Sequence, residues 1–172
     1  MTTAVETGPW QLDPTASTVV VRHRTMWGLV TVKVRFGTVA GRGEVLADGT
    51  ATGTVTVAAD SLDSRNGGRD KHLRSADFLD TGTHPEIVLT VRGAGPLAAD
   101  GTVPVSGELT VRGVAQPQDL VARVTGAEDG AVTLETEFTV DRERFGMTWN
   151  QLGMVRGPAT VVATLRFTRT EA

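Results

Sequence analysis

The run RDKHLRSADFLD, residues 69–80, gathers side chains that could do acid–base or metal chemistry. Six of its twelve residues are charged, and His72 lies among them. Such a cluster suits a catalytic pair, a metal site or the outer face of a helix that carries ion pairs. Asp70 and Arg74 stand four residues apart, which is the spacing of a helical ion pair. We therefore predict a short helix and turn here, docked onto the rest of the fold through Leu73 and Phe78.

Metal and nucleophile chemistry find little support elsewhere in the sequence. The three histidines, His23, His72 and His84, are far apart, and there is no cysteine. No His or carboxylate spacing matches a metal motif, so we predict no metal and no cofactor. The five serines lie outside any G-x-S-x-G elbow, and the aspartates of 69–80 each have a basic neighbour. We therefore predict no catalytic residue.

Size and charge narrow the classes of function further. The chain has 172 residues, is 40% hydrophobic and carries a formal net charge of −3. We predict a flexible tail over residues 1–9 and one domain over 10–170. The balance of charge argues against a nucleic-acid partner, and no apolar run reaches the length of a membrane-spanning helix. The N-terminus shows no secretory signal, so we expect a cytoplasmic location.

Period-two alternation of apolar and polar residues runs through most of the chain, which predicts half-buried strands. Turn sequences separate the runs, and only 69–80 and 142–145 look helical. Strands with one dry face favour an antiparallel sheet that closes on itself or stacks as a sandwich. We favour a closed barrel. The alternating runs are VTVKVRF (30–36), TATGTVTVA (50–58), EIVLTVR (86–92), VPVSGELTVR (103–112), VTLETEFTVD (132–141) and VVATLRFTR (161–169), with looser runs at 17–24 and 119–126.

The expected dry face is rich in small residues and poor in aromatic ones. A barrel of about eight strands is just wide enough to be filled by side chains or to hold one ligand. Two stretches near strand ends, 24–30 and 145–155, carry large apolar groups interrupted by glycines. They suit either a flexible lining at the mouth of a cavity or a plug that closes the barrel. Composition leaves both choices open.

Four motifs in a fixed order resemble the YceI-like family of polyisoprenoid-binding proteins. They are WQLDPTAS (10–17), RDKHLRSADFLD (69–80) followed by Pro85, GELTVRGVAQP (107–117) and FTVDRERFGM (138–147). Each motif is weak alone, and their order and spacing make the match specific. The resemblance implies an all-β fold, namely an eight-stranded antiparallel up-and-down (lipocalin-like) barrel with one or two short helices. It also implies an apolar tunnel that binds a polyisoprenoid, an isoprenoid quinone or a similar lipid, and it leaves a homodimer open.

The resulting hypothesis is a non-catalytic lipid-binding or carrier protein. For the cavity we predict inward residues Val32, Val34, Phe36, Val55, Ile87, Leu89, Leu109, Leu134, Phe138, Leu165 and Phe167. For the mouth we predict Met26, Trp27, Phe78, Phe145, Met147, Trp149, Leu152 and Met154. For a diphosphate or quinone headgroup we predict Arg69, Arg74 and Arg142, because guanidinium groups suit such oxygens.

Two other hypotheses remain at this point. A lipid-modifying enzyme at the barrel mouth would need titratable side chains that converge inside the cavity, for example around His23. A stress-response or interaction module would have a barrel filled by its own side chains. The volume of the cavity separates the second alternative from a lipid-binding protein.

Overall fold

A computed structural model describes residues 6–128, 130–150 and 156–170. Residues 1–5 of the predicted tail therefore lie outside the described residues. One α-helix, α1 (Gly67–Arg74), and three short 3-10 helices, η1 (Pro14–Ala16), η2 (Ala59–Ser61) and η3 (Arg142–Phe145), interrupt a single sheet. The strands are β1 (Gly8–Leu12), β2 (Thr18–Thr25), β3 (Val30–Phe36), β4 (Val39–Val45), β5 (Ala51–Ala58), β6 (Leu62–Asp63), β7 (Glu86–Ala94), β8 (Thr102–Val111), β9 (Val114–Glu128), β10 (Ala131–Val140) and β11 (Arg156–Arg169).

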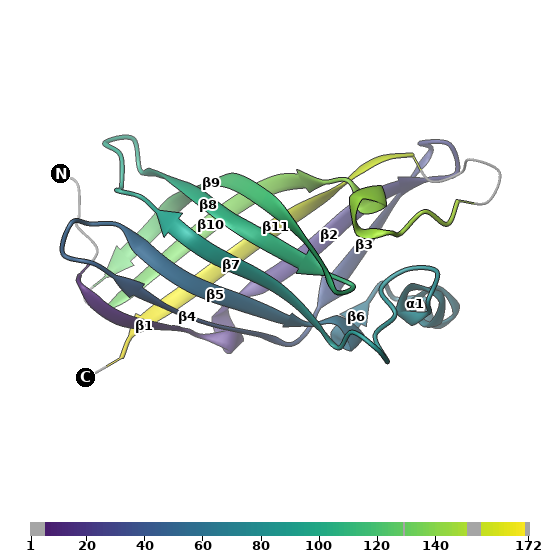
Figure 1. Cartoon of the computed structure of the whole chain (residues 1–172), viewed down its shortest axis with the longest axis horizontal. Coiled ribbons are helices and arrows are strands. Elements are labelled where there is room, and N and C mark those ends of the chain that lie inside the picture. The colour runs from purple at the N-terminus through teal and green to yellow at the C-terminus, as the bar shows by residue number, and fades with distance from the viewer. Residues whose placement is uncertain (1–5, 129, 151–155, 171–172) are drawn as a thin grey trace.

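The sheet closes on itself as an antiparallel barrel, as predicted (Figure 1). The short strand β1 pairs with β4 on one side and with β11 on the other, so that Trp10 lies opposite both Gly43 and Arg169. β2 follows β1 after η1 and pairs with a second part of β11. β3 and β4 are likewise two parts of one wall element, separated only at Gly37 and Thr38. With β1 merged with β2, β3 merged with β4, and the two-residue strand β6 set aside, the barrel has eight strands in up-and-down order.

Alternation found most of the strands but missed β1 and β4. The predicted run 30–36 is the whole of β3, and five further runs fall within a few residues of strands. β4 reads VAGRGEV, in which two glycines remove the period-two signal. Those glycines are needed because their neighbours come close: a Cβ on Gly41 would lie 3.1 Å from the Thr54 carbonyl oxygen and 3.3 Å from the Leu12 side chain, and one on Gly43 would lie 3.0 Å from the Thr52 carbonyl oxygen. Close packing between strands therefore replaces the hydrophobic pattern at this seam.

Helix α1 begins where Asn66 caps it by accepting a hydrogen bond from the Arg69 amide. The helix ends at Arg74, earlier than the predicted helix and turn at 69–80, because the Ser75 hydroxyl and amide both bond to the His72 carbonyl. After it, the chain turns through Asp80, whose amide bonds to the Ser75 carbonyl.

The predicted ion pair between Asp70 and Arg74 is wrong. Buried Asp70 accepts hydrogen bonds from the Ser64 amide and hydroxyl at 2.9 and 2.6 Å. The Arg74 guanidinium donates to the carbonyls of Asp60 and Leu62 at 3.1 and 2.9 Å. Both side chains satisfy polar groups of the preceding segment, which would otherwise be left without partners under the helix. They tie α1 to the barrel rather than to itself.

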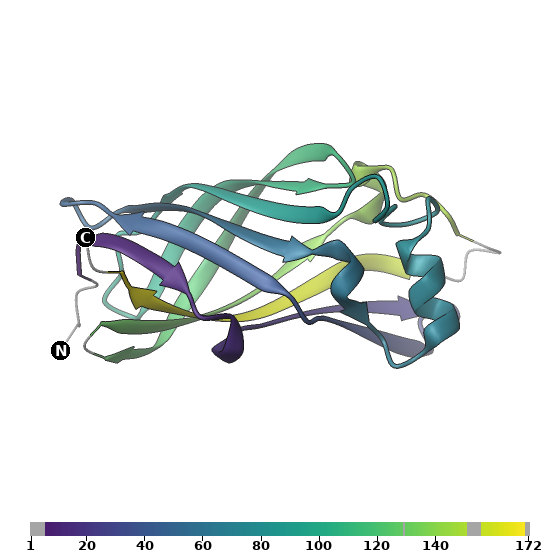
Figure 2. The same ribbon diagram turned by 90° about the horizontal axis from the view of Figure 1, so that it is seen from below.

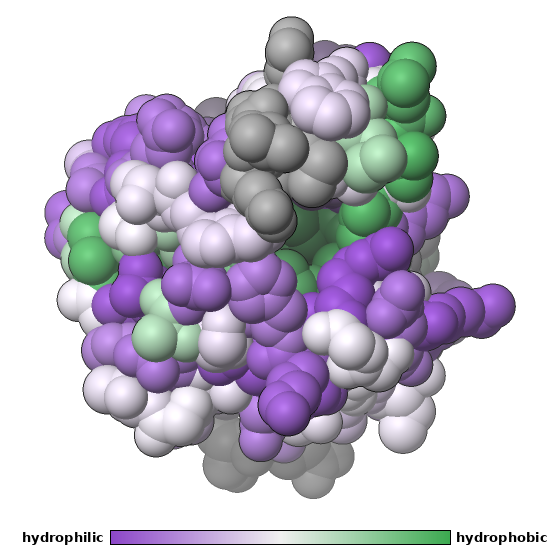
Figure 3. Space-filling view, turned by 90° about the vertical axis from the view of Figure 1, so that its right-hand side faces the viewer, coloured by the Kyte–Doolittle hydropathy of each residue, from purple (hydrophilic) through white to green (hydrophobic). Residues whose placement is uncertain are grey.

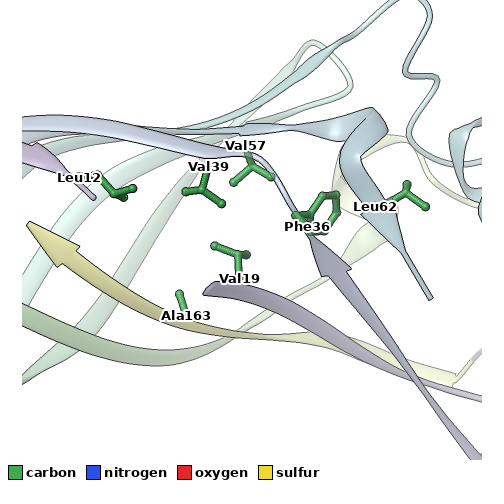
Figure 4. Close-up of a cluster of buried hydrophobic side chains, with 7 residues drawn as sticks. All are labelled: Leu12, Val19, Phe36, Val39, Val57, Leu62 and Ala163. Carbon is green, nitrogen blue, oxygen red and sulfur yellow. The ribbon is translucent and has the colours of Figure 1, made fainter. Parts of the chain in front are cut away.

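The core fills only part of the barrel interior. Figure 4 shows seven buried side chains strung along it, from Leu12 near β1 to Leu62 in β6. A second cluster, made of Leu109, Val111, Phe145 and Met147, packs between β8 and the η3 segment. Helix α1 and the β2–β3 hairpin lie at one end of the barrel, and the start of β1 lies at the other (Figures 1 and 2). The space between these elements is where a cavity can remain.

The close approach of strands predicts a sharp difference between two strand glycines. A Cβ on Gly107 in β8 would lie 2.5 Å from the Thr90 carbonyl oxygen, whereas one on Gly126 in β9 would have no neighbour nearer than 3.9 Å. We expect Gly107→Ala to lower the free energy of unfolding by about 1–3 kcal/mol, because backbone atoms must move apart. Gly126→Ala is the matched control and should change it by under about 1 kcal/mol. Chemical denaturation measures both, and equal losses would contradict the close approach of β7 and β8 as the cause.

Candidate ligand-binding cavity

A cavity of about 360 Å³ lies inside the barrel and opens at the end that carries α1. Its walls come from β2, β3, β5, β7, β8, β10 and β11, and its opening is bordered by α1, the turn after it and the segment after η3. Figure 3 looks onto that end and shows a hollow with hydrophobic side chains at its floor. The lining is overwhelmingly aliphatic and aromatic. A volume in this range is typical of pockets that hold a small molecule.

Nine of the eleven residues predicted to face inward line this cavity: Val32, Val34, Phe36, Val55, Ile87, Leu89, Leu109, Phe138 and Leu165. The other two, Leu134 and Phe167, share the inward face, because Leu134 pairs with Leu165 and Val132 pairs with Phe167. They are not among the lining residues. The register places Phe167 farther along β11 from the opening than Leu165, and Phe167 packs against the core cluster, whereas Leu134 stands opposite Leu165 without bordering the cavity.

Sequence patterns missed part of the lining for identifiable reasons. Val19 and Val21 belong to an unbroken run of valines in β2, in which alternation is invisible, and only pairing with Phe36 and Val34 shows that they face inward. Leu62, Leu73 and Leu79 reach the cavity from the segment between β5 and β7. That segment has no strand period, so its contribution depends on how it folds back over the barrel end.

Of the predicted mouth residues, Phe78, Met147 and Trp149 line the cavity. Phe145 is buried in the second core cluster and supports the mouth from behind. Met26 and Trp27 are exposed at the tip of the β2–β3 hairpin and do not contribute to the lining. Leu152 and Met154 lie outside the described residues. Of the two alternatives for residues 145–155, a lining of the mouth and a plug, both are present in part: Met147 and Trp149 line the cavity, and a packed cluster surrounds Phe145.

Three rings meet at the opening. The His72 ring lies edge-on to Phe78 and Trp149, with centroids 5.1 and 4.5 Å apart, and the centroids of Phe78 and Trp149 are 5.5 Å apart. His72 Nε2 also lies 2.9 Å from Asp77 Oδ2, which orients the imidazole. His72 is thus not only a surface residue of α1, because its ring forms part of the cavity wall. These contacts join α1, the following turn and the segment after η3 around one opening.

Arg142 is a buried cation at the edge of the cavity, with 8% of its surface exposed. Its Nη1 donates hydrogen bonds of 2.7 Å to the carbonyls of both Met147 and Trp149. Burial lowers the pKa of the guanidinium, and the charges of Glu143 and Asp141 oppose that shift. The side chain therefore holds the segment that carries two lining residues. The Asp141 side chain caps η3 by accepting a hydrogen bond from the Glu143 amide.

The other two predicted headgroup residues differ in position. Arg74 is occupied by the carbonyls of Asp60 and Leu62 and is not part of the lining. Arg69 lines the cavity near its opening, and within the described part of the chain its guanidinium makes no hydrogen bond or ion pair. Of the three arginines, Arg69 therefore has the donors that an entering anionic group could use.

His23 is the polar residue that sequence analysis flagged without placing. It lines the cavity from β2. Its Nδ1 lies 2.9 Å from the Arg24 carbonyl oxygen, and since a carbonyl only accepts, Nδ1 donates there. Nε2 is buried and has no hydrogen-bond partner among the described residues. No Asp or Glu side chain is among the described residues that line the cavity, so none of these faces His23 as a carboxylate partner.

The described residues hold neither a metal centre nor a membrane-spanning helix. No group of three His, Cys, Asp or Glu side chains in residues 6–128, 130–150 and 156–170 is arranged to hold a metal ion. Within the same ranges, no helix has the length and apolar character needed to cross a membrane.

Comparison with known sequences gives a consistent family match. The family model described as the YceI-like domain matches residues 10–167. Protein YceI of Escherichia coli O157:H7 is 40% identical over 76 residues, which are 44% of this chain and 38% of that protein. A UPF0312 protein of Vibrio vulnificus is 37% identical over 105 residues, which are 58% of this chain and 53% of that protein. The chain thus spans about half or less of the length of these curated relatives.

Solved structures share the fold at low sequence identity. BcnA of Burkholderia cenocepacia superposes with a TM-score of 0.81 at 17% identity, covering 90% of this chain and 98% of that one. A polyisoprenoid-binding domain from Saccharophagus degradans, implicated in plant cell wall breakdown, gives a TM-score of 0.76 at 17% identity, covering 96% and 100%. The YceI protein of Campylobacter jejuni gives 0.72 at 19% identity, covering 83% and 88%. These likenesses establish the barrel architecture.

The contacts of Arg142 predict that it stabilises the cavity mouth. Arg142→Met removes two charged hydrogen bonds to backbone carbonyls, so we expect the free energy of unfolding to fall by about 1.5–3 kcal/mol. Hydrogen exchange of the Met147 amide, which bonds to the Arg142 carbonyl, should also speed up. Arg144→Met is the matched control, because Arg144 is exposed and its guanidinium donates to the Gln116 side chain, and the substitution should cost about 0.5 kcal/mol or less. Equal effects of the two substitutions would contradict an anchoring role.

Proposed function

The chain belongs to the YceI-like family, and from this premise we propose that it is a lipid-binding protein. It holds one long-chain isoprenoid amphiphile, such as a polyisoprenoid or an isoprenoid quinone, inside the barrel and does not transform it. The observation that carries this proposal is the apolar cavity of about 360 Å³ at the centre of a closed barrel. The description of the Saccharophagus degradans neighbour as a polyisoprenoid-binding domain supports the same class of ligand.

The chemistry of the lining favours a branched hydrocarbon chain. Burial of each CH2 of a ligand tail is favourable by about 0.8 kcal/mol, so a long tail binds tightly without any directional contact. Valine and leucine side chains supply most of the wall, and Val19, Val21 and Leu165 line its inner part. No charged side chain comes from that part of the described lining, which leaves nothing for a polar headgroup to pair with there.

Polar groups gather instead at the end that carries α1, which sets the orientation of the ligand. Arg69 and His72 reach the cavity from α1, and Arg142 reaches it from η3. We infer that the tail enters first and that the headgroup stays near Arg69. The Arg69 guanidinium suits the oxygens of a diphosphate, because it can donate two parallel hydrogen bonds. Arg142 contributes its charge, while its Nη1 remains committed to the backbone.

The arrangement supports binding over the two alternatives. General acid–base chemistry needs a second titratable group that faces the first, and His23 has no lining carboxylate to face. The Thr136 hydroxyl, which also lines the cavity, donates to the Val121 carbonyl at 2.9 Å. His72 is bonded to Asp77. A barrel filled by its own side chains would have no space of this size, so the cavity disfavours the filled-core module. A cytoplasmic location and a homodimer stay predictions.

Blocking the cavity tests the proposal directly. Ala163 lines the middle of the cavity, so Ala163→Phe fills the space with a ring and adds no charge. Delipidated wild-type protein should take up a polyprenol or ubiquinone, and organic extraction followed by mass spectrometry should recover it. We expect about tenfold less uptake by Ala163→Phe, as expected when a filled cavity excludes several CH2 groups. Thr139→Phe is the matched control, because Thr139 is exposed on the outer face of β10. Equal uptake by wild type and the folded Ala163→Phe variant would refute the cavity as the binding site.

Arg69 can be tested by changing the headgroup of the probe. Arg69→Gln should weaken binding of a prenyl diphosphate by about tenfold or more, the usual effect of losing hydrogen bonds to a charged group. Binding of the matching prenyl alcohol should change little. Arg35→Gln serves as the control, because Arg35 is exposed on the outer face of β3. Equal weakening of both ligands would mean that Arg69 supports the mouth and does not recognise the headgroup.

A further inference from the structure

Large apolar side chains are concentrated at the tip of the β2–β3 hairpin. Of the six large hydrophobic residues that are exposed in the described part of the chain, four lie within residues 26–30. The other two, Leu46 and Val121, lie apart from them in the barrel. We define the apolar tip as these four residues, whose exposed fractions are 43% for Met26, 46% for Trp27, 86% for Leu29 and 44% for Val30.

Turn geometry does not explain the residues at this tip. Met26 and Trp27 have φ angles of +52° and +56°, in the left-handed region that glycine and asparagine adopt most easily. Bulky side chains there cost both backbone strain and unfavourable contact with water. Small polar residues would meet this turn geometry at lower cost, and the exposed apolar surface of the tip is available to an outside partner.

The apolar tip lies on the rim of the cavity. Val30 of the tip pairs with Thr25, which lines the cavity, and two residues farther along, His23 pairs with Val32, both of which line it. The hairpin stands at the same end of the barrel as α1 (Figure 1), and hydrophobic side chains border the hollow in the end-on view of Figure 3. Apolar surface therefore continues from the exposed tip to the cavity interior.

The hairpin also carries one sign of charge. Residues 18–36 contain Arg22, Arg24, Lys33 and Arg35 and no Asp or Glu, in a chain whose net charge is −3. Arg22 pairs with Glu137 at 2.7 Å. Arg24, Lys33 and Arg35 are exposed, and within residues 6–128, 130–150 and 156–170 they form no ion pair. Strand alternation places them on the outer face, because His23, Val32 and Val34 face inward.

We propose that the apolar tip inserts into the surface of an anionic phospholipid bilayer, with the basic outer face of the hairpin against the headgroups. An apolar tip next to a basic face is the pattern of interfacial membrane binding. The cavity mouth then opens toward the acyl chains, so a ligand with a long tail need not cross water. Four side chains and three free cations give reversible binding, which suits repeated docking. This proposal goes beyond ligand binding and holds whatever the cavity contains.

Vesicle sedimentation of the full chain tests the proposal. We expect the protein to bind phosphatidylcholine vesicles that contain phosphatidylglycerol, to bind pure phosphatidylcholine vesicles more weakly, and to be released by salt. The double variant Met26→Ser/Leu29→Ser should bind about tenfold more weakly, because it loses the most exposed apolar contacts. The matched control is Leu46→Ser/Val121→Ser, which removes two exposed apolar side chains elsewhere and should bind as wild type does.

Fluorescence gives an independent readout of insertion. Trp10 is buried and Trp149 lines the cavity mouth, whereas Trp27 is 46% exposed at the tip, so transfer of the tip into the bilayer should shift the emission to the blue. In Trp149→Phe, which removes the signal of the mouth, the shift should remain, and in Trp149→Phe/Trp27→Phe it should disappear. Absence of vesicle binding by the folded wild type, or undiminished binding by the Met26→Ser/Leu29→Ser variant, would overturn the proposal. So would a dimer in sedimentation velocity that the same variant dissolves, because the tip would then be a contact between two copies.

The tip variant also separates this proposal from the one about the cavity. It should still take up a polyprenol delivered in detergent, because the cavity lining is unchanged. If only Ala163→Phe loses uptake in detergent, the cavity is the ligand site. If only the tip variant loses vesicle binding, the apolar tip is the membrane contact.

Discussion

Closure of the barrel depends on one short strand. β1 has five residues, and it forms hydrogen bonds with β4 through Gly43 and with β11 through residues near Arg169. Without this double pairing, the sheet would have two free edges and its apolar face would lie open to water. Because the strand must approach a glycine-rich neighbour closely, Gly41 belongs to the same constraint: a Cβ there would lie 3.3 Å from the Leu12 side chain. The cavity exists because the closed wall encloses more volume than the inward side chains fill.

The sizes of the inward side chains decide which parts of the interior are packed and which form the cavity. Small residues such as Ala163 and Val21 line the middle, where bulkier ones would have filled the barrel. Packed clusters lie around Leu12 and Phe167 on one side and around Phe145 on the other, while Phe36 and Phe138 border the cavity itself. A closed, dry wall with a vacant centre favours an apolar guest, since water gains few hydrogen bonds there.

At the end that carries α1, two sets of side-chain hydrogen bonds to the backbone position the elements whose rings meet at the opening. Asp70 and Arg74 fix the helix to the backbone of the segment before it, and Arg142 fixes the segment after η3. With both elements held, the rings of His72 and Trp149 meet over the opening. The charged groups of the run 69–80 are therefore mostly structural, and Arg69 alone among its cations is left near the cavity with free donors.

The sequence by itself determined the fold class, the family and most of the inward face, because strand alternation and four ordered motifs are local features of the chain. Alternation placed Val34, Leu89 and Phe138 in the wall. Only the tertiary structure decided what no local pattern encodes. It shows that β1 closes the barrel, that Arg74 and Arg142 bond to backbone carbonyls, and that Leu134 does not border the cavity. Each of these depends on which backbone groups meet after the chain folds back, and hydrogen-bond partners are chosen there by proximity and burial rather than by spacing in sequence.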